Sequence, residues 1–168
     1  MAAEDILKYL NLTVDGRGYA GKIEEYNAPD LTLATEDFRG GGMDAPIDIE
    51  VGMEKLACSF VLTSYDADVL ALWGVSEGSL VQLTARGSLE SLDGTKTAVV
   101  HKMHGKLLSL ARGTWGAGAK PSLTVNIGLR YYKEIHGQRV TSEIDVINMV
   151  RITNGVDQLA EHRANIGL

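Results

Sequence analysis

The sequence is poor in cysteine, in long apolar runs and in basic charge, and each shortage excludes a class of protein. Its one cysteine, Cys58, lies in the apolar run 56–60 without an acid-rich or base-rich neighbour, which predicts a packed core thiol and not a reactive one. The longest apolar run, 69–75, is far shorter than the about 20 residues that cross a bilayer. The start of the chain lacks the charged and apolar regions of a signal peptide, so we expect neither membrane insertion nor Sec export.

The charge balance excludes a further class. The net charge is −6 and the isoelectric point is about 5.2, so no basic surplus is available to neutralise phosphates, and tight nucleic-acid binding is not expected. Apolar residues make up 45% and charged residues 23% of the chain, which excludes the composition of a disordered protein. A chain of 168 residues suits one hydrophobic core, so we expect a single domain over residues 1–168.

Apolar and polar residues alternate with a period of two over most of the chain, as half-buried β-strands require. The alternating segments are 8–15, 47–62, 81–90, 96–112, 123–131 and 140–152. Asp15-Gly16 and the run 92–95 are turn sequences, and Gly137 is expected to turn the chain into a second long hairpin. A parity change near Glu54 predicts a turn or bulge, and the length of 96–112 predicts a bent or bulged strand. In segment 123–131 the apolar residues at odd positions, from Leu123 to Tyr131, are expected to face one side of the sheet. Together these segments predict a mainly β protein.

Two short helices and one long connection complete this reading. Asp66 can cap residues 67–73, which Gly74 would end, and Asn154 can cap a C-terminal helical segment, 154–168. Residues 27–46 show no period at all and contain several glycines and prolines. A structureless connection of that length is usually either functional or disordered.

Three sequence patterns resemble catalytic, nucleotide-binding or metal-binding motifs, but the secondary structure predicted around them does not support such a site. Residues 16–21 fit G-x-G-x-x-G, but no helix can follow to offer its N-terminus to a phosphate, so a hairpin turn is favoured. Residues 74–78 fit G-x-S-x-G around Ser76, but a helix precedes and a strand follows, the reverse of a nucleophile elbow. His101 and His104 would point to opposite faces of a strand and could not share a metal. No catalytic residue, metal or cofactor is expected.

Trp115 stands out because it lies in the glycine-rich run 113–118. A large apolar side chain in such a loop either folds back onto its own domain or inserts into a neighbouring molecule. The sequence leaves both alternatives open.

Several separated segments carry a resemblance to a known family. They are Asn11-Leu12-Thr13-Val14-Asp15-Gly16, Thr35 to Met43 followed by Ala45-Pro46, Tyr131-Tyr132-Lys133, Glu143 to Asn148, and Asn154 to Arg163 with the ending Gly167-Leu168. In order, spacing and total length they resemble the major tail tube protein of P2-like contractile phages and the related R-type bacteriocins. The region 74–120 resembles that family least.

The resemblance implies a two-sheet β-sandwich or barrel with one short flanking helix and a short C-terminal helix. It also implies hexameric rings, stacked inside a contractile sheath, whose inner sheets join into a ring-wide β-barrel around a lumen. In this family the loop 27–46 reaches axially to the next ring, which implies a role in inter-subunit or inter-ring contacts. The candidate contact residues are Glu36, Asp37, Phe38, Arg39, Gly40, Gly41, Gly42, Met43 and Trp115.

The resemblance further implies the setting in which such a protein works. Its partners would be other copies of itself, the tail sheath protein, the tape-measure protein, and the baseplate and tail-terminator proteins, with DNA only as passing cargo. It would reside in a virion tail or an extracellular tailocin particle, after assembly in the cytoplasm of the bacterial host.

Two other hypotheses stay open beside the tube. A ring protein of a type VI secretion system would share the fold and carry effectors, although the match at 39–43 favours the phage-type tube. A small serine hydrolase using Ser76 belongs to a different class. An infectious phage and a DNA-free bacteriocin are not separated by the sequence, because the same tube serves both.

Overall fold

Strands dominate the computed structural model, which describes residues 4–168; residues 1–3, part of the start read for an export signal, lie outside this range. The strands are β1 (Ile6–Val14), β2 (Arg17–Gly18), β3 (Ile23–Asn27), β4 (Leu33–Phe38), β5 (Ile47–Met53), β6 (Ala57–Leu62), β7 (Val81–Glu90), β8 (Lys96–Ala111), β9 (Leu123–His136), β10 (Arg139–Asp145), β11 (Val150–Thr153) and β12 (Val156–Asp157). The helices are α1 (Ala67–Leu70) and α2 (Ala160–Asn165). Within 4–168, neither helix has the length and apolarity that crossing a membrane requires. The chain is mainly β, as expected.

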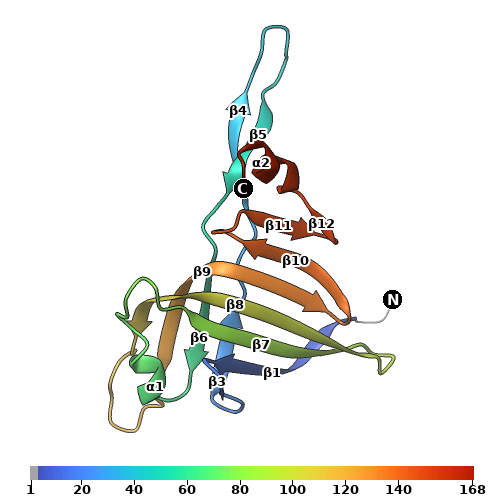
Figure 1. The fold of residues 1–168 in the computed structure, drawn as a ribbon. Coiled ribbons are helices and arrows are strands. Elements are labelled where there is room, and N and C mark those ends of the chain that lie inside the picture. The colour runs from blue at the N-terminus through green and yellow to red at the C-terminus, as the bar shows by residue number, and fades with distance from the viewer. Residues whose placement is uncertain (1–3) are drawn as a thin grey trace.

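Ten strands form one antiparallel sheet, which folds over on itself. The order is β12-β11-β10-β9-β8-β7-β1-β2, with β6 and then β3 attached beside β9. Strand β9 pairs with β8 along most of its length, with β6 through its first half and with β10 through its second half. In Figure 1, β3 and β6 run across the direction of β1, β7 and β8. This is an orthogonal two-layer packing in which long strands pass from one layer to the other, and it confirms the expected sandwich.

The core fills the space between these two layers. Its fully buried side chains come from both layers and from α1, and include Leu12, Val14, Phe60, Leu62, Val69, Leu83, Met103, Leu123, Val125, Ile127 and Tyr132. Cys58 belongs to this core, with 4% of its surface exposed. This burial confirms the expected packed cysteine, and it raises the pKa of the Cys58 thiol to about 12, which predicts low reactivity.

The two longest strands bend where they pass between layers, as the length of 96–112 predicted. The register of β8 against β9 shifts between His104 and Gly105. A Cβ atom at Gly105 would lie 2.4 Å from the carbonyl oxygen of Gly128, so only glycine fits where the strands approach this closely.

The same irregularity corrects one expectation about the buried face. His104 pairs with Tyr131 and Gly105 pairs with Leu129, so Arg130 is an extra residue on β9. An extra residue reverses the inward and outward alternation beyond it. The core residue is therefore Tyr132, with 2% of its surface exposed, and the expectation that Tyr131 continues the buried stripe was wrong.

Most turns fall where the sequence placed them. Asp15 and Gly16 both have positive φ angles, 47° and 82°, and join β1 to β2 as a two-residue turn. No helix follows them, which confirms the hairpin turn over a nucleotide-binding loop. The parity change near Glu54 marks the break between β5 and β6, which pair with different strands.

The two helices differ from their predicted ends. The Asp66 carboxylate accepts hydrogen bonds from the backbone N–H groups of Asp68 and Val69, as predicted, but α1 ends at Leu70 and not at residue 73. The prediction that Asn154 caps the C-terminal helix was wrong. Asn154 and Gly155, with φ angles of 53° and 80°, instead form the turn between β11 and β12. Asn-Gly suits this two-residue hairpin turn better than a helix start, and α2 begins only at Ala160.

The second long hairpin was predicted in part. Strands β9 and β10 pair across Gly137 as expected, but β10 ends at Asp145. The Asp145 carboxylate accepts hydrogen bonds from the backbone N–H groups of Ile147 and Asn148 and so holds a turn there. Val146 is exposed in that turn and is not part of the buried stripe.

Candidate functional site

The long connection 27–46 is not structureless, contrary to the sequence prediction. Its residues 33–38 form β4, which pairs with β5 and with no other strand in the described range. Figure 1 shows this hairpin projecting beyond the rest of the molecule, next to α2. The sequence pattern missed β4 because Glu36 and Asp37 replace the apolar residues of a half-buried strand, and a strand that buries neither face needs no alternation.

One face of the hairpin arm is largely apolar. Residues directly opposite in an antiparallel pair point to the same side, and the pairs here are Phe38 with Ile47 and Glu36 with Ile49. Phe38 is 50% exposed and Ile47 is 52% exposed, so about half of the surface of each residue is uncovered in the single chain. Adjacent exposed apolar side chains on a projecting arm mark a contact surface for another molecule.

The other face of the arm is acidic. Asp37 lies directly opposite Asp48, and like charges in this position repel. Among the salt bridges within residues 4–168, none involves either carboxylate. Glu50 on the same face pairs with Arg151 of β11 at 2.6 Å, which ties the base of the arm to the large sheet. The arm is thus fixed where it joins the sheet, and beyond that point it presents two carboxylates that form no salt bridge within residues 4–168.

The tip of the arm is held by its own residues. The Arg39 Nε group donates a hydrogen bond to the Met43 carbonyl at 3.1 Å, and the Gly40 amide lies 3.2 Å from the Met43 sulfur. Gly42 has a φ of 88°, a conformation that glycine adopts without strain. Gly41 completes the turn. The contact residues predicted between 36 and 43 are therefore gathered on one short arm and its tip.

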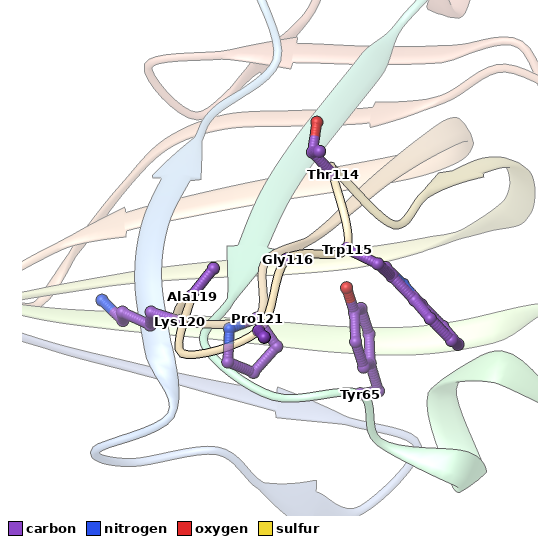
Figure 2. Close-up of a pocket in the computed structure, with 8 residues that line it drawn as sticks. Tyr65, Thr114, Trp115, Gly116, Ala119, Lys120 and Pro121 are labelled. Carbon is purple, nitrogen blue, oxygen red and sulfur yellow. The ribbon is translucent and has the colours of Figure 1, made fainter.

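Trp115 lies on the loop between β8 and β9, outside that arm. Its ring centroid is 5.9 Å from that of Tyr65, whose hydroxyl donates a hydrogen bond to the Arg112 carbonyl at 2.6 Å. Figure 2 shows the two rings side by side, with Trp115 at the outside of the loop. Trp115 is nevertheless 77% exposed. One edge of the indole rests on its own domain while most of it stays open to a second molecule.

Among the described residues, no histidine, lysine or carboxylate forms a hydrogen bond with the Ser76 hydroxyl. Ser76 lies between α1 and β7, and its hydroxyl is 3.4 Å from the Ser79 hydroxyl. Within residues 4–168, no group of three histidine, cysteine or acidic side chains is placed to hold a metal ion. His101 contacts Tyr26 inside the molecule, whereas His104 stacks on Tyr131. The two histidines thus have different surroundings, in line with their predicted opposite faces.

The large sheet offers a second contact surface that the sequence did not reveal. One side of β1 pairs with β7 from Ile6 to Val14. On its other side, within residues 4–168, Thr13 and Val14 pair with β2, and the Leu12 carbonyl accepts a hydrogen bond from the Tyr19 amide. The backbone of residues 6–11 therefore forms an open sheet edge among the described residues. Its side chains include the exposed Ile6, Leu7 and Tyr9. Long apolar edges of this kind are where further strands add.

The projecting arm, the open sheet edge and the exposed indole are three surfaces that the single chain leaves uncovered, and they favour the class of structural subunits that assemble with other copies. Solved structures share this fold: the sheath-tube complex of the extracellular contractile injection system PVC matches with a TM-score of 0.58 at 10% identity, covering 76% of this chain and 88% of that one. The anti-feeding prophage baseplate matches with a TM-score of 0.55 at 11% identity, covering 80% of this chain and 97% of that one.

Sequence comparison gives the particular family. The family model "Phage tail tube protein FII" matches residues 4–167. The tail tube protein of Escherichia phage P2 is 30% identical over the full length of both chains, and the major tail tube protein of Serratia phage KSP20 is 28% identical over 92% of this chain and 91% of its own. This chain belongs to the phage tail tube protein FII family, which confirms the resemblance to contractile-phage tail tubes.

Proposed function

We propose that this protein forms hexameric rings that stack into the inner tube of a contractile tail, with a lumen for DNA or ions during ejection. The open edge of β1 carries this proposal. The opposite edge of the same sheet ends in β12, a strand of two residues, so both edges are available for pairing with other copies. Head-to-tail pairing of these edges forms a closed ring when the rotations between successive copies add up to a full turn. The sheets of all copies then join into one barrel.

We further propose which face of that barrel lines the lumen. The layer of β3 and β6 covers one face of the large sheet, so we place that layer outside the barrel and the opposite face of the sheet toward the bore. Thr84, Arg86 and Lys102 alternate there with the buried Leu83, Ala85 and Met103. The bore wall is accordingly polar and partly basic in spite of the net charge of −6.

The projecting arm suits stacking. We assign its apolar face, with Phe38 and Ile47, and its acidic pair, Asp37 and Asp48, to contacts with the adjacent ring. Burial of the apolar face and an arginine or lysine from the neighbour would remove both of the arm's unfavourable features. The solved relatives are described as a sheath-tube complex and a 6-fold symmetrised baseplate, which supports six copies per ring and contacts with sheath and baseplate here.

The remaining assignments follow from the same family. The tape-measure protein and a tail terminator are proposed partners, since one solved relative is a sheath/tube terminator. The particle is assembled in the host cytoplasm and acts as a virion tail or an extracellular tailocin. The protein's role is structural and does not involve catalysis.

Electron microscopy of the purified protein tests both parts of the proposal. The unmodified chain is expected to give rings and tubes, and persistent monomers under all conditions would refute the tube. Deletion of residues 36–43 should leave the circular-dichroism spectrum of a folded β-protein, with a loss no larger than the pairing of β4 with β5, because these residues lie outside the core cluster. The deletion variant should form rings without long tubes. If this variant does form long tubes, the arm is not needed for stacking, although the proposal of rings would still stand.

A further inference from the structure

We propose that Trp115 of one copy inserts into an apolar pocket at the base of the hairpin arm of the next copy along the tube. The inference rests on the proposed stacking of rings, and it assigns a specific contact within it. It also decides between the two alternatives that the sequence left open for Trp115, in favour of insertion.

The receiving pocket lies between the base of β5 and the turn that joins β10 to β11. Its volume is about 580 Å³. Apolar side chains supply much of its lining, among them Met53, Leu56, Leu129, Met149 and Leu159. Pockets of a few hundred Å³ lined in this way hold aromatic groups. An indole is large enough to displace water from the lining and small enough to enter.

The inserting side chain is already presented outward. Trp115 is the most exposed large apolar residue of its loop, and its contact with Tyr65 at 5.9 Å supports one side of the ring. A supported but exposed indole loses little conformational freedom on binding, because the Tyr65 contact already restricts it. Buried tryptophans at the centre of an interface commonly contribute the largest share of its binding free energy.

The positions of the two features suit a contact between stacked copies. In Figure 1 the loop between β8 and β9 lies beside α1 at one end of the molecule, while β5 passes next to α2 toward the other end. A feature at one end and its complement toward the other cannot meet within one molecule. They meet in a head-to-tail contact, which is the kind that continues into an open filament.

Charge at the two surfaces is complementary at one point. The pocket lining holds more acidic than basic groups, but Glu50 is paired with Arg151, Lys55 also lies in the lining, and the Asp145 carboxylate holds the turn at Ile147 and Asn148, which leaves Glu54 as the acid that can receive a partner. On the other surface Arg112 begins the Trp115 loop and takes part in no salt bridge within residues 4–168. An arginine that approaches the Glu54 carboxylate beside an inserted ring would fix the orientation of the contact.

Fluorescence of Trp115 measures insertion directly. The chain has two tryptophans, so a Trp73→Phe variant leaves Trp115 as the only indole. Trp73 is itself exposed and donates one hydrogen bond to the Leu108 carbonyl, so the fold should tolerate this change. On assembly into tubes, the Trp115 emission should shift to shorter wavelength and acrylamide quenching should fall several-fold. An unchanged spectrum in assembled tubes overturns the inference.

Cross-linking identifies the receiving surface. Thr114→Cys keeps the indole and places a thiol beside it, and Val146→Cys places a second thiol at the pocket. With a short bis-maleimide this double variant should give a ladder of covalent oligomers in tubes. The matched control pairs Thr114→Cys with Leu92→Cys, which is also exposed but does not line the pocket, and should give no ladder. Equal ladders in both variants, or none in either, overturn the assignment of the pocket.

Removal of the indole tests how much it contributes to the free energy of the contact between rings. Trp115→Ala should raise the protein concentration needed for tube growth by about thirtyfold, as expected of a tryptophan hot spot, and should leave single rings intact. If Trp115→Ala forms tubes at the same protein concentration as the unmodified chain, the inference is contradicted. Such tubes would still support the proposed function. If the unmodified chain forms no tubes at all, the proposed function itself fails.

Discussion

Replacing Gly105 by alanine tests whether the close approach of β8 and β9 decides the stability of the fold. A Cβ atom at this position would lie 2.4 Å from the Gly128 carbonyl oxygen and 2.8 Å from the Ile127 Cγ2 atom. Ordinary contact needs about 3.4 Å, so the two backbones would have to separate by about 1 Å at the bend. That separation opens the hydrogen-bonded pairing of the two longest strands.

Two effects of the change oppose each other. Alanine loses less conformational entropy than glycine on folding, which favours the variant by about 0.5–1 kcal/mol. Overpacking of a well-filled core costs about 1–3 kcal/mol and more where the backbone itself must move. Because a backbone carbonyl is the obstacle here, the steric cost prevails, and we expect a loss of about 3 kcal/mol in the free energy of unfolding. For a chain of this length that corresponds to a fall of about 6–12 °C in Tm.

Urea unfolding, followed by circular dichroism below the assembly concentration, measures this loss. Gly87→Ala is the matched control on the neighbouring strand, because its Cβ would lie 2.9 Å from the Leu7 Cδ1 atom and at an ordinary contact distance, 4.0 Å, from the Tyr9 carbonyl oxygen. Leu7 is an exposed, flexible side chain that can rotate away, so this control should change stability by less than about 1 kcal/mol. If Gly105→Ala is as stable as Gly87→Ala, the close approach does not constrain the bend.

Three further predictions concern single residues. Burial lowers the pKa of His101 below its usual 6.5, and the nearby Glu134 opposes this shift. At a pH between the two pKa values the unfolded chain binds a proton that the folded chain does not, so Tm should rise with pH up to about 6.5. Thermal unfolding of His101→Gln should show a flatter rise. With its pKa raised to about 12, Cys58 should react with iodoacetamide near pH 8 about a thousandfold more slowly in the folded chain than in urea, and equal rates would contradict its burial. Asn154→Ala should cost about 1 kcal/mol in urea unfolding, because alanine disfavours the left-handed backbone at φ 53°; no loss would remove the strain argument.

The sequence by itself determined the local features of this protein. Asp15-Gly16 forms its turn because both residues tolerate positive φ, and Asp66 starts α1 because its carboxylate reaches the amides two and three residues on. Most alternating segments predicted buried strands, because a strand that buries one face carries an apolar residue at every second position. The exception is 47–53, which alternates but is exposed on the arm as β5, so the prediction that it is half-buried was wrong. These signals depend on neighbours within a few positions, so reading along the chain recovers them.

Only the tertiary structure decided which strands meet and what they leave exposed. Strand β4 exists because β5 pairs with it, and the Arg151 to Glu50 salt bridge that ties the arm to the sheet joins residues far apart in the sequence. The switch from Tyr131 to Tyr132 as the core residue follows from an extra residue opposite Gly105. Such pairings between distant segments leave no periodic signal in either segment alone. For this reason the open edge of β1, the arm and the pocket at its base became visible only once the sheet was folded.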